Sequence, residues 1–224
     1  MKFGSAMKVV VAASLLTVAT ATQAASVTFK YLVDGGSITN VDKVFFNFHN
    51  VNQITNDLEV AYSDIQVNTI SIGSELGIQF QYGGWTLAGA NKHYDLAFDF
   101  QVMILPQYEQ WITDNTLEFV GGTVADGQVI ISETVRDASL NLLAGKLVYA
   151  QPGLTNYTDH QVFPGGPYAL INISMDFALN TGNDPASVAF TSHFDQSFSQ
   201  IPEPASMGLM LLGAAGMLCS RRRR

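Results

Sequence analysis

The stretch "DLAFDFQVMI" (residues 95–104) places a large apolar side chain at every second position. These apolar residues are Leu96, Phe98, Phe100, Val102 and Ile104. The opposite face carries Asp95, Asp99 and Gln101. Side chains of an extended chain point alternately to its two sides, so we expect one face in a core and the other in water. The stretch therefore predicts a half-buried antiparallel strand.

The same alternation recurs through residues 25–200, in "LGIQFQY" (76–82), "YALINISMDFAL" (168–179) and "ASVAFTSHF" (186–194). In the last of these we expect Val188, Phe190 and Phe194 to share the buried face. Further strands are expected at 27–33, 43–49, 67–72, 116–122, 129–135 and 140–150, and one helical turn at 107–115. Clusters of Gly, Asn and Asp supply the turns between them. The pattern predicts an all-β fold, an antiparallel β-sandwich of jelly-roll type, with a barrel as the alternative.

Residues 1–24 have the composition of a secretory signal peptide. Lys2 and Lys8 precede the apolar run "VVVAASLLTVATA" (9–21), and small residues occupy positions 22 and 24, as signal peptidase requires. The run lacks the polar stripe of an amphipathic helix, which argues against a buried N-terminal helix. The sequence predicts Sec-dependent export and cleavage by signal peptidase, leaving a β-sandwich domain at 25–200.

The chain ends in "IPEPASMGLMLLGAAGMLCSRRRR" (201–224). Prolines interrupt regular structure, so the triplet Pro202, Glu203 and Pro204 is expected to be extended and exposed. The apolar run 205–220 spans about 24 Å as a helix, slightly less than the roughly 30 Å of a bilayer core. The basic residues that follow should hold this end on the cytoplasmic side; they are Arg221, Arg222, Arg223 and Arg224. The segment predicts a short transmembrane helix that is poorly suited to permanent anchoring.

This order of triplet, apolar helix and arginine tail resembles the PEP-CTERM sorting signal of exosortase substrates. The resemblance implies recognition by an exosortase-like membrane protease and cleavage near the triplet. It also implies release of the domain to the cell surface or extracellular matrix, in association with exopolysaccharide or biofilm. An ordinary single-span anchor is the alternative.

The charge of the predicted domain excludes one class of partner. The chain contains 11 basic and 19 acidic residues, and the two terminal segments hold six of the former but one of the latter. Residues 25–200 therefore carry a net charge near −13, which repels nucleic acid. The single cysteine, Cys219, lies in the apolar run, so the domain has neither a disulfide nor a thiolate metal site.

No catalytic signature is assembled in the sequence. It contains neither an HExxH nor a GxSxG motif, and its four histidines are scattered. Asp95 and Asp99 lie about 13 Å apart along one strand, too far for a glycosidase pair. The sequence leaves open a catalytic pair of carboxylates that come from separate strands. The sequence predicts a non-enzymatic surface or matrix protein, with a matrix-polymer hydrolase as the least favoured alternative.

Two kinds of binding residue are candidates. Aromatic rings could stack on sugars in a carbohydrate-binding or adhesive module, the main alternative function; the candidates are Trp85, Tyr108 and Trp111. Burial of the tryptophans in the core is the favoured interpretation. Oxygen ligands in turns could hold a structural calcium ion, although no EF-hand-type loop is present; these are Asp114, Asn115, Asn183 and Asp184. No other cofactor is expected.

Overall fold

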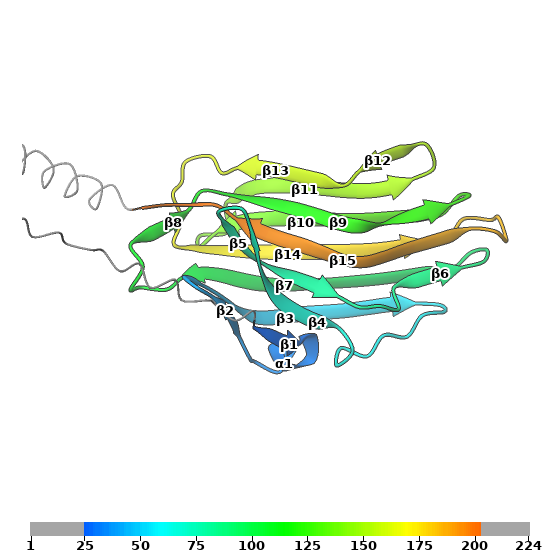
Figure 1. Ribbon diagram of the computed structural model, residues 1–224, viewed down its shortest axis with the longest axis horizontal. Coiled ribbons are helices and arrows are strands. Elements are labelled where there is room, and N and C mark those ends of the chain that lie inside the picture. Colours follow the sequence, from blue (N-terminus) through cyan, green and yellow to red (C-terminus); the bar gives the residue numbers. More distant parts are fainter. Residues whose placement is uncertain (1–24, 203–224) are drawn as a thin grey trace, which may run out of the picture.

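The computed structural model describes residues 25–202 as antiparallel strands with one short helix (Figure 1). One seven-stranded sheet has the order β1-β4-β5-β15-β9-β13, with β6 also paired to β15. Its strands are β1 (Ser26–Thr28), β4 (Gln66–Ile72), β5 (Glu75–Gln81), β6 (Thr86–Ala88), β9 (Asp114–Val124), β13 (Thr158–Val162) and β15 (Val188–Phe198).

The second seven-stranded sheet has the order β12-β11-β10-β14-β7-β3-β2. Its strands are β2 (Ile38–Asn40), β3 (Lys43–Thr55), β7 (His93–Ile104), β10 (Gln128–Asp137), β11 (Leu142–Gln151), β12 (Leu154–Asn156) and β14 (Leu170–Asn180). A separate pair joins β8 (Gln110–Ile112) to β16 (Gln200–Pro202). Within residues 25–202 neither large sheet closes on itself, so the antiparallel all-β prediction is confirmed and the barrel alternative is wrong.

The core lies between the two sheets and is rich in aromatic rings. In β7 every even-numbered side chain from 94 to 104 is buried, as the alternation predicts. Phe98 of the second sheet packs against Phe80 of the first, with ring centroids 5.2 Å apart. Phe80 in turn stacks on Phe194 at 4.8 Å. Burying rings of this size supplies the main driving force for holding the sheets together.

Two local predictions are wrong, for different reasons. Residues 29–33 form helix α1 (Phe29–Val33) rather than a strand, because the Thr28 side chain accepts a hydrogen bond from the Tyr31 amide and caps the helix. The segment 107–115 contains β8 rather than a helical turn. Its partner, β16, lies about 90 residues away in sequence, so no local pattern could reveal the pairing.

The predicted buried face of 186–194 is also partly wrong. A bulge between Thr191 and His193 shifts the register of β15 against β9. The shift reverses the facing of side chains before it relative to those after it. Phe190 is consequently 41% exposed, whereas Phe194 is fully buried.

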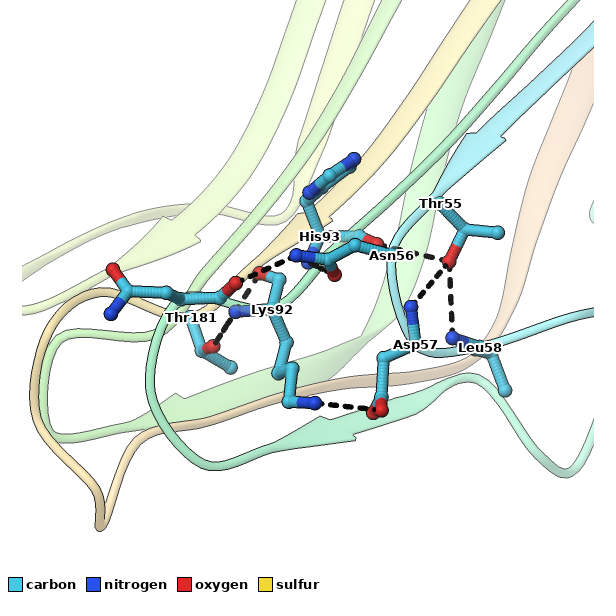
Figure 2. Close-up of polar contacts among 8 residues, drawn as sticks. Thr55, Asn56, Asp57, Leu58, Lys92, His93 and Thr181 are labelled. Atoms are coloured by element: carbon cyan, nitrogen blue, oxygen red, sulfur yellow. Dashed lines mark hydrogen bonds and ion pairs between the residues drawn. The ribbon is translucent and has the colours of Figure 1, made fainter.

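Polar contacts join the ends of β3, β7 and β14 at the end of the sandwich farthest from β8 (Figures 1 and 2). The amide of His93 donates to Asn56 Oδ1 at 2.9 Å, and the amide of Lys92 donates to Thr181 Oγ1 at 2.8 Å. Lys92 Nζ also lies 2.8 Å from Asp57 Oδ1. These bonds satisfy backbone groups where the ladders end, and they hold three strand ends in register.

A buried polar layer crosses the interior at the opposite end. Glu133 of β10 and Lys146 of β11 form an ion pair of 3.3 Å with fully buried side chains. Asn115 of β9 donates to Glu133 at 2.6 Å, and Gln196 of β15 also donates to it. Burial lowers the pKa of Lys146, and the adjacent Glu133 carboxylate opposes that shift. The carboxylate of Glu133 therefore connects both sheets.

The predicted signal peptide (1–24) and transmembrane helix (205–220) lie outside the described residues. Within residues 25–202, no helix is long and apolar enough to cross a membrane.

Replacing Glu133 by Ala should lower the free energy of unfolding by about 3–5 kcal/mol, because Lys146 would remain buried without its partner. Chemical denaturation measures the loss. Asp34→Ala is the control, because it breaks an exposed 2.9 Å pair with Lys30 and should leave the midpoint nearly unchanged. Equal effects of the two substitutions would contradict the prediction.

The ionisation of Asp95 makes the stability of the fold depend on pH. Partial burial, and then the neighbouring charge of Asp176, raise its pKa above the ordinary 3.8. The ionised form therefore destabilises the fold; the penalty is complete above the folded-state pKa and disappears below about 3.8. Asp95→Asn should raise the melting temperature at pH 7 and leave it unchanged near pH 3. A gain of the same size at both pH values would show that charge is not the cause.

Candidate functional site

Trp85 lies in the core, as the favoured interpretation of the sequence expected, and not at a surface where a sugar could stack on it. Its side chain is fully buried. The indole ring packs edge-on against Phe177 at 4.9 Å and stacks on Phe194 at 5.7 Å. The indole ring is part of the aromatic core, so a ligand cannot contact it.

Strand β8, which contains Trp111 and closely follows Tyr108, lies at the other end of the sandwich from β6, which directly follows Trp85 (Figure 1). Tyr108 is 36% exposed in the turn before β8, and Trp111 is half-buried within β8. The three predicted aromatic residues therefore do not form one stacking platform.

The four predicted calcium ligands do not form one site either. Asp114 and Asn115 begin β9, whereas Asn183 and Asp184 lie in the turn between β14 and β15. That turn is near the end of β9, because Val188 pairs with Val124. The 11 residues of β9 separate the two pairs by roughly 33 Å. Asp184 instead accepts a hydrogen bond from the Ala186 amide at 2.8 Å, which shapes the turn.

A depression of about 380 Å³ lies on the outer face of the second sheet. Neighbouring strands β3, β7, β14 and β10 contribute to it. Its polar lining consists of His49, Asp99, Arg136, Asn172 and Ser174. The sequence did not predict this site, because its residues come from strands far apart in the chain.

Two bulges in β3 turn its side chains toward the depression. They occur on either side of His49, next to Asn47 and Asn50, which adopt positive φ angles of 55° and 53°. Asparagine tolerates this conformation better than most residues, so the repeated Asn in "NFHN" was the available signal. The bulges let Asn50 Nδ2 donate to Asp99 Oδ2 at 2.6 Å.

The polar contacts in the depression suit binding rather than nucleophilic catalysis. His49 Nδ1 lies 2.6 Å from the Asn47 carbonyl, and Nε2 lies 3.9 Å from Asp99 Oδ2. Both imidazole nitrogens therefore face oxygen atoms other than the Ser174 hydroxyl, and a serine–histidine relay is not assembled. Arg136 Nη1 donates to the Leu140 carbonyl at 3.3 Å, which occupies one of the five N–H donors of a guanidinium.

The last described strand ends within the predicted sorting triplet. Ile201 pairs with Trp111 and Pro202 with Gln110, so Pro202 is both the last residue of β16 and the first of the triplet. Gln200 accepts a hydrogen bond from the fully buried Lys43. Glu203, Pro204 and the arginines from Arg221 to Arg224 lie outside the described residues.

Comparison with solved structures gives distant likenesses. One is the enzymatically active domain of bacteriophage CBA120 tailspike protein 4, with 12% identity, 66% of this chain and 19% of that chain covered, and a TM-score of 0.29. Another is TmCBM61 in complex with β-1,4-galactotriose, with 11% identity, 69% and 89% covered, and a TM-score of 0.31. The family 11 carbohydrate-binding module of Clostridium thermocellum has 10% identity, 74% and 91% covered, and a TM-score of 0.22. This chain spans about a fifth of the tailspike chain. TM-scores this low carry no argument about ligand or activity.

Comparison with curated proteins gives no match. The C-terminal resemblance, in contrast, is confirmed, because the family model of the PEP-CTERM protein-sorting motif matches residues 200–224. The match begins at Gln200, the first residue of β16. The chain therefore carries a PEP-CTERM protein-sorting motif that starts in β16, the last strand within residues 25–202.

Proposed function

We propose that the protein is exported through the Sec machinery, loses its signal peptide, and is processed by an exosortase-like membrane protease into a non-catalytic surface or extracellular-matrix protein. The observation that carries this proposal is the direct continuation of β16 into the sorting motif. The domain would be displayed or released as one folded unit, because no spacer separates it from the triplet.

The short connection limits where the tethered domain can lie. The predicted transmembrane run begins at position 205, three residues after Pro202. Three extended residues reach at most about 11 Å. While tethered, the end of the sandwich that contains β8 and β16 would therefore face the membrane. Cleavage near the triplet would free the domain without removing any of its strands.

The geometry of the depression favours polysaccharide binding as a second function, linked to the exopolysaccharide that the sorting motif suggests. Neighbouring hydroxyl groups of a sugar present paired donors and acceptors. Asp99 offers carboxylate oxygens, Arg136 offers a fork of N–H groups, and both line the same depression. Its position on an outer sheet face would leave room for a long polymer.

Mass spectrometry of the protein from its native cells tests the processing. The mature chain should begin near Ala25 and end close to Pro204, because both terminal segments are removed. Recovery of a chain that ends in Arg224 as the dominant species would contradict exosortase processing.

Affinity electrophoresis in gels that contain exopolysaccharide from the same cells tests the second function. Arg136→Ala should weaken binding about tenfold, since a hydrogen bond from a charged group contributes about 1.5–3 kcal/mol. Lys30→Ala, an exposed basic residue on α1, is the matched control for loss of one positive charge. Unretarded wild-type protein, or equal retardation of all three proteins, would rule out binding at the depression.

A further inference from the structure

Three metal-ligating side chains converge on the first sheet, on the face that points away from the core. They are Glu75 at the start of β5, Asp114 at the start of β9 and His160 in β13. One ligand atom from each lies within 4.8 Å of the other two. Neither Glu75 nor His160 was among the residues that the sequence singled out, because the three come from strands far apart in the chain.

The strand register explains how these residues meet. Strand β15 lies between β5 and β9, where Leu76 pairs with Phe198 and Ser197 pairs with Thr116. On this intervening strand, the Ser197 hydroxyl donates a hydrogen bond to the Glu75 carboxylate. Ser199 contacts both, with its amide donating to Asp114 Oδ1 at 3.2 Å and its hydroxyl donating to Glu75 Oε1 at 3.3 Å.

The imidazole completes the cluster from the edge strand. His160 pairs with Thr116, and its Nδ1 lies 3.0 Å from Thr116 Oγ1. With Nδ1 donating its proton to this hydroxyl, Nε2 keeps a lone pair for a metal, the arrangement usual for histidine ligands. Burial decreases from Asp114, which is 9% exposed, through Glu75 to the exposed His160. An ion would therefore have a path from solvent and room for water ligands.

The local charge balance is an independent indication of a cation. Two buried lysines sense the charge of Asp114, but each is paired with another carboxylate: Lys43 with Asp42 at 3.2 Å and Lys146 with Glu133 at 3.3 Å. Within residues 25–202, neither Glu75 nor Asp114 forms a salt bridge with a lysine or arginine. Two neighbouring carboxylates thus remain without a cationic side chain, and a divalent ion would neutralise both.

We propose that Glu75, Asp114 and His160 bind one divalent transition-metal ion, with Zn²⁺ as the best match. Two carboxylate oxygens and one imidazole nitrogen form a ligand set that suits zinc, whereas calcium and magnesium prefer oxygen ligands throughout. The ion would join β5, β9 and the edge strand β13. Through Ser199 it would also brace the segment that leads into the sorting motif.

Thermal unfolding of the full-length protein in detergent, stripped of metal by chelation and free of added histidine tags, tests the proposal. Zn²⁺ at about 100 times its Kd should raise the folded-to-unfolded ratio about 100-fold, a melting temperature increase of roughly 5–10 °C. His160→Ala should abolish the increase, and so should Glu75→Gln, which preserves shape. His193→Ala is the matched control: its ring contacts Ser192 in the same sheet, and the shift should persist.

Three results would overturn the proposal. One is a wild-type protein whose melting temperature does not respond to Zn²⁺. Another is an undiminished shift in His160→Ala with one zinc still bound per chain, which would place the ion elsewhere. The third is a shift with Ca²⁺ as large as that with Zn²⁺, which would indicate an all-oxygen site.

Discussion

Buried charges need partners, and in this protein the final residues of the domain supply several of them. Gln196 donates to the buried Glu133, the Ser199 amide donates to Asp114, and Gln200 accepts from the buried Lys43. Without these residues, buried charged groups would lose hydrogen bonds that water cannot replace, so we expect the fold to be complete only when the chain has been placed as far as residue 200. The sorting motif, which is matched from that residue onward, thus begins inside a structural element.

This constraint gives the two ends of the sandwich different roles. The end where β3, β7 and β14 meet near Lys92 is joined by backbone-directed bonds that fix strand register. The end that contains β8 and β16 combines the buried polar layer, the Glu75 cluster and the exit of the sorting segment. The depression around Asp99 lies on the other sheet and shares none of these residues, so binding there is compatible with either a tethered or a released domain.

The sequence predicted what depends on local alternation and missed what depends on distant partners. Period-two patterns located β7 and β14 because each buries one face along its whole length. They failed at 107–115, where β8 exists only because β16 pairs with it, and in β15, where a bulge reverses the facing of Phe190. The sites were missed for the same reason: His49 and Asp99, like Glu75 and His160, become neighbours only through strand order. The sorting motif could be predicted without knowing the fold, because its residues are contiguous in the sequence.

Hydrogen exchange of the full-length protein most directly tests whether the fold extends to the sorting motif. Backbone amides in a paired strand exchange only when the strand opens. Peptides covering residues 196–201 should therefore be protected as strongly as those from the central strand β14. The account would be contradicted if the amides of residues 196–201 exchanged as rapidly as those of the exposed turn between β11 and β12. Such exchange would mean that a flexible linker connects the sorting motif to the domain.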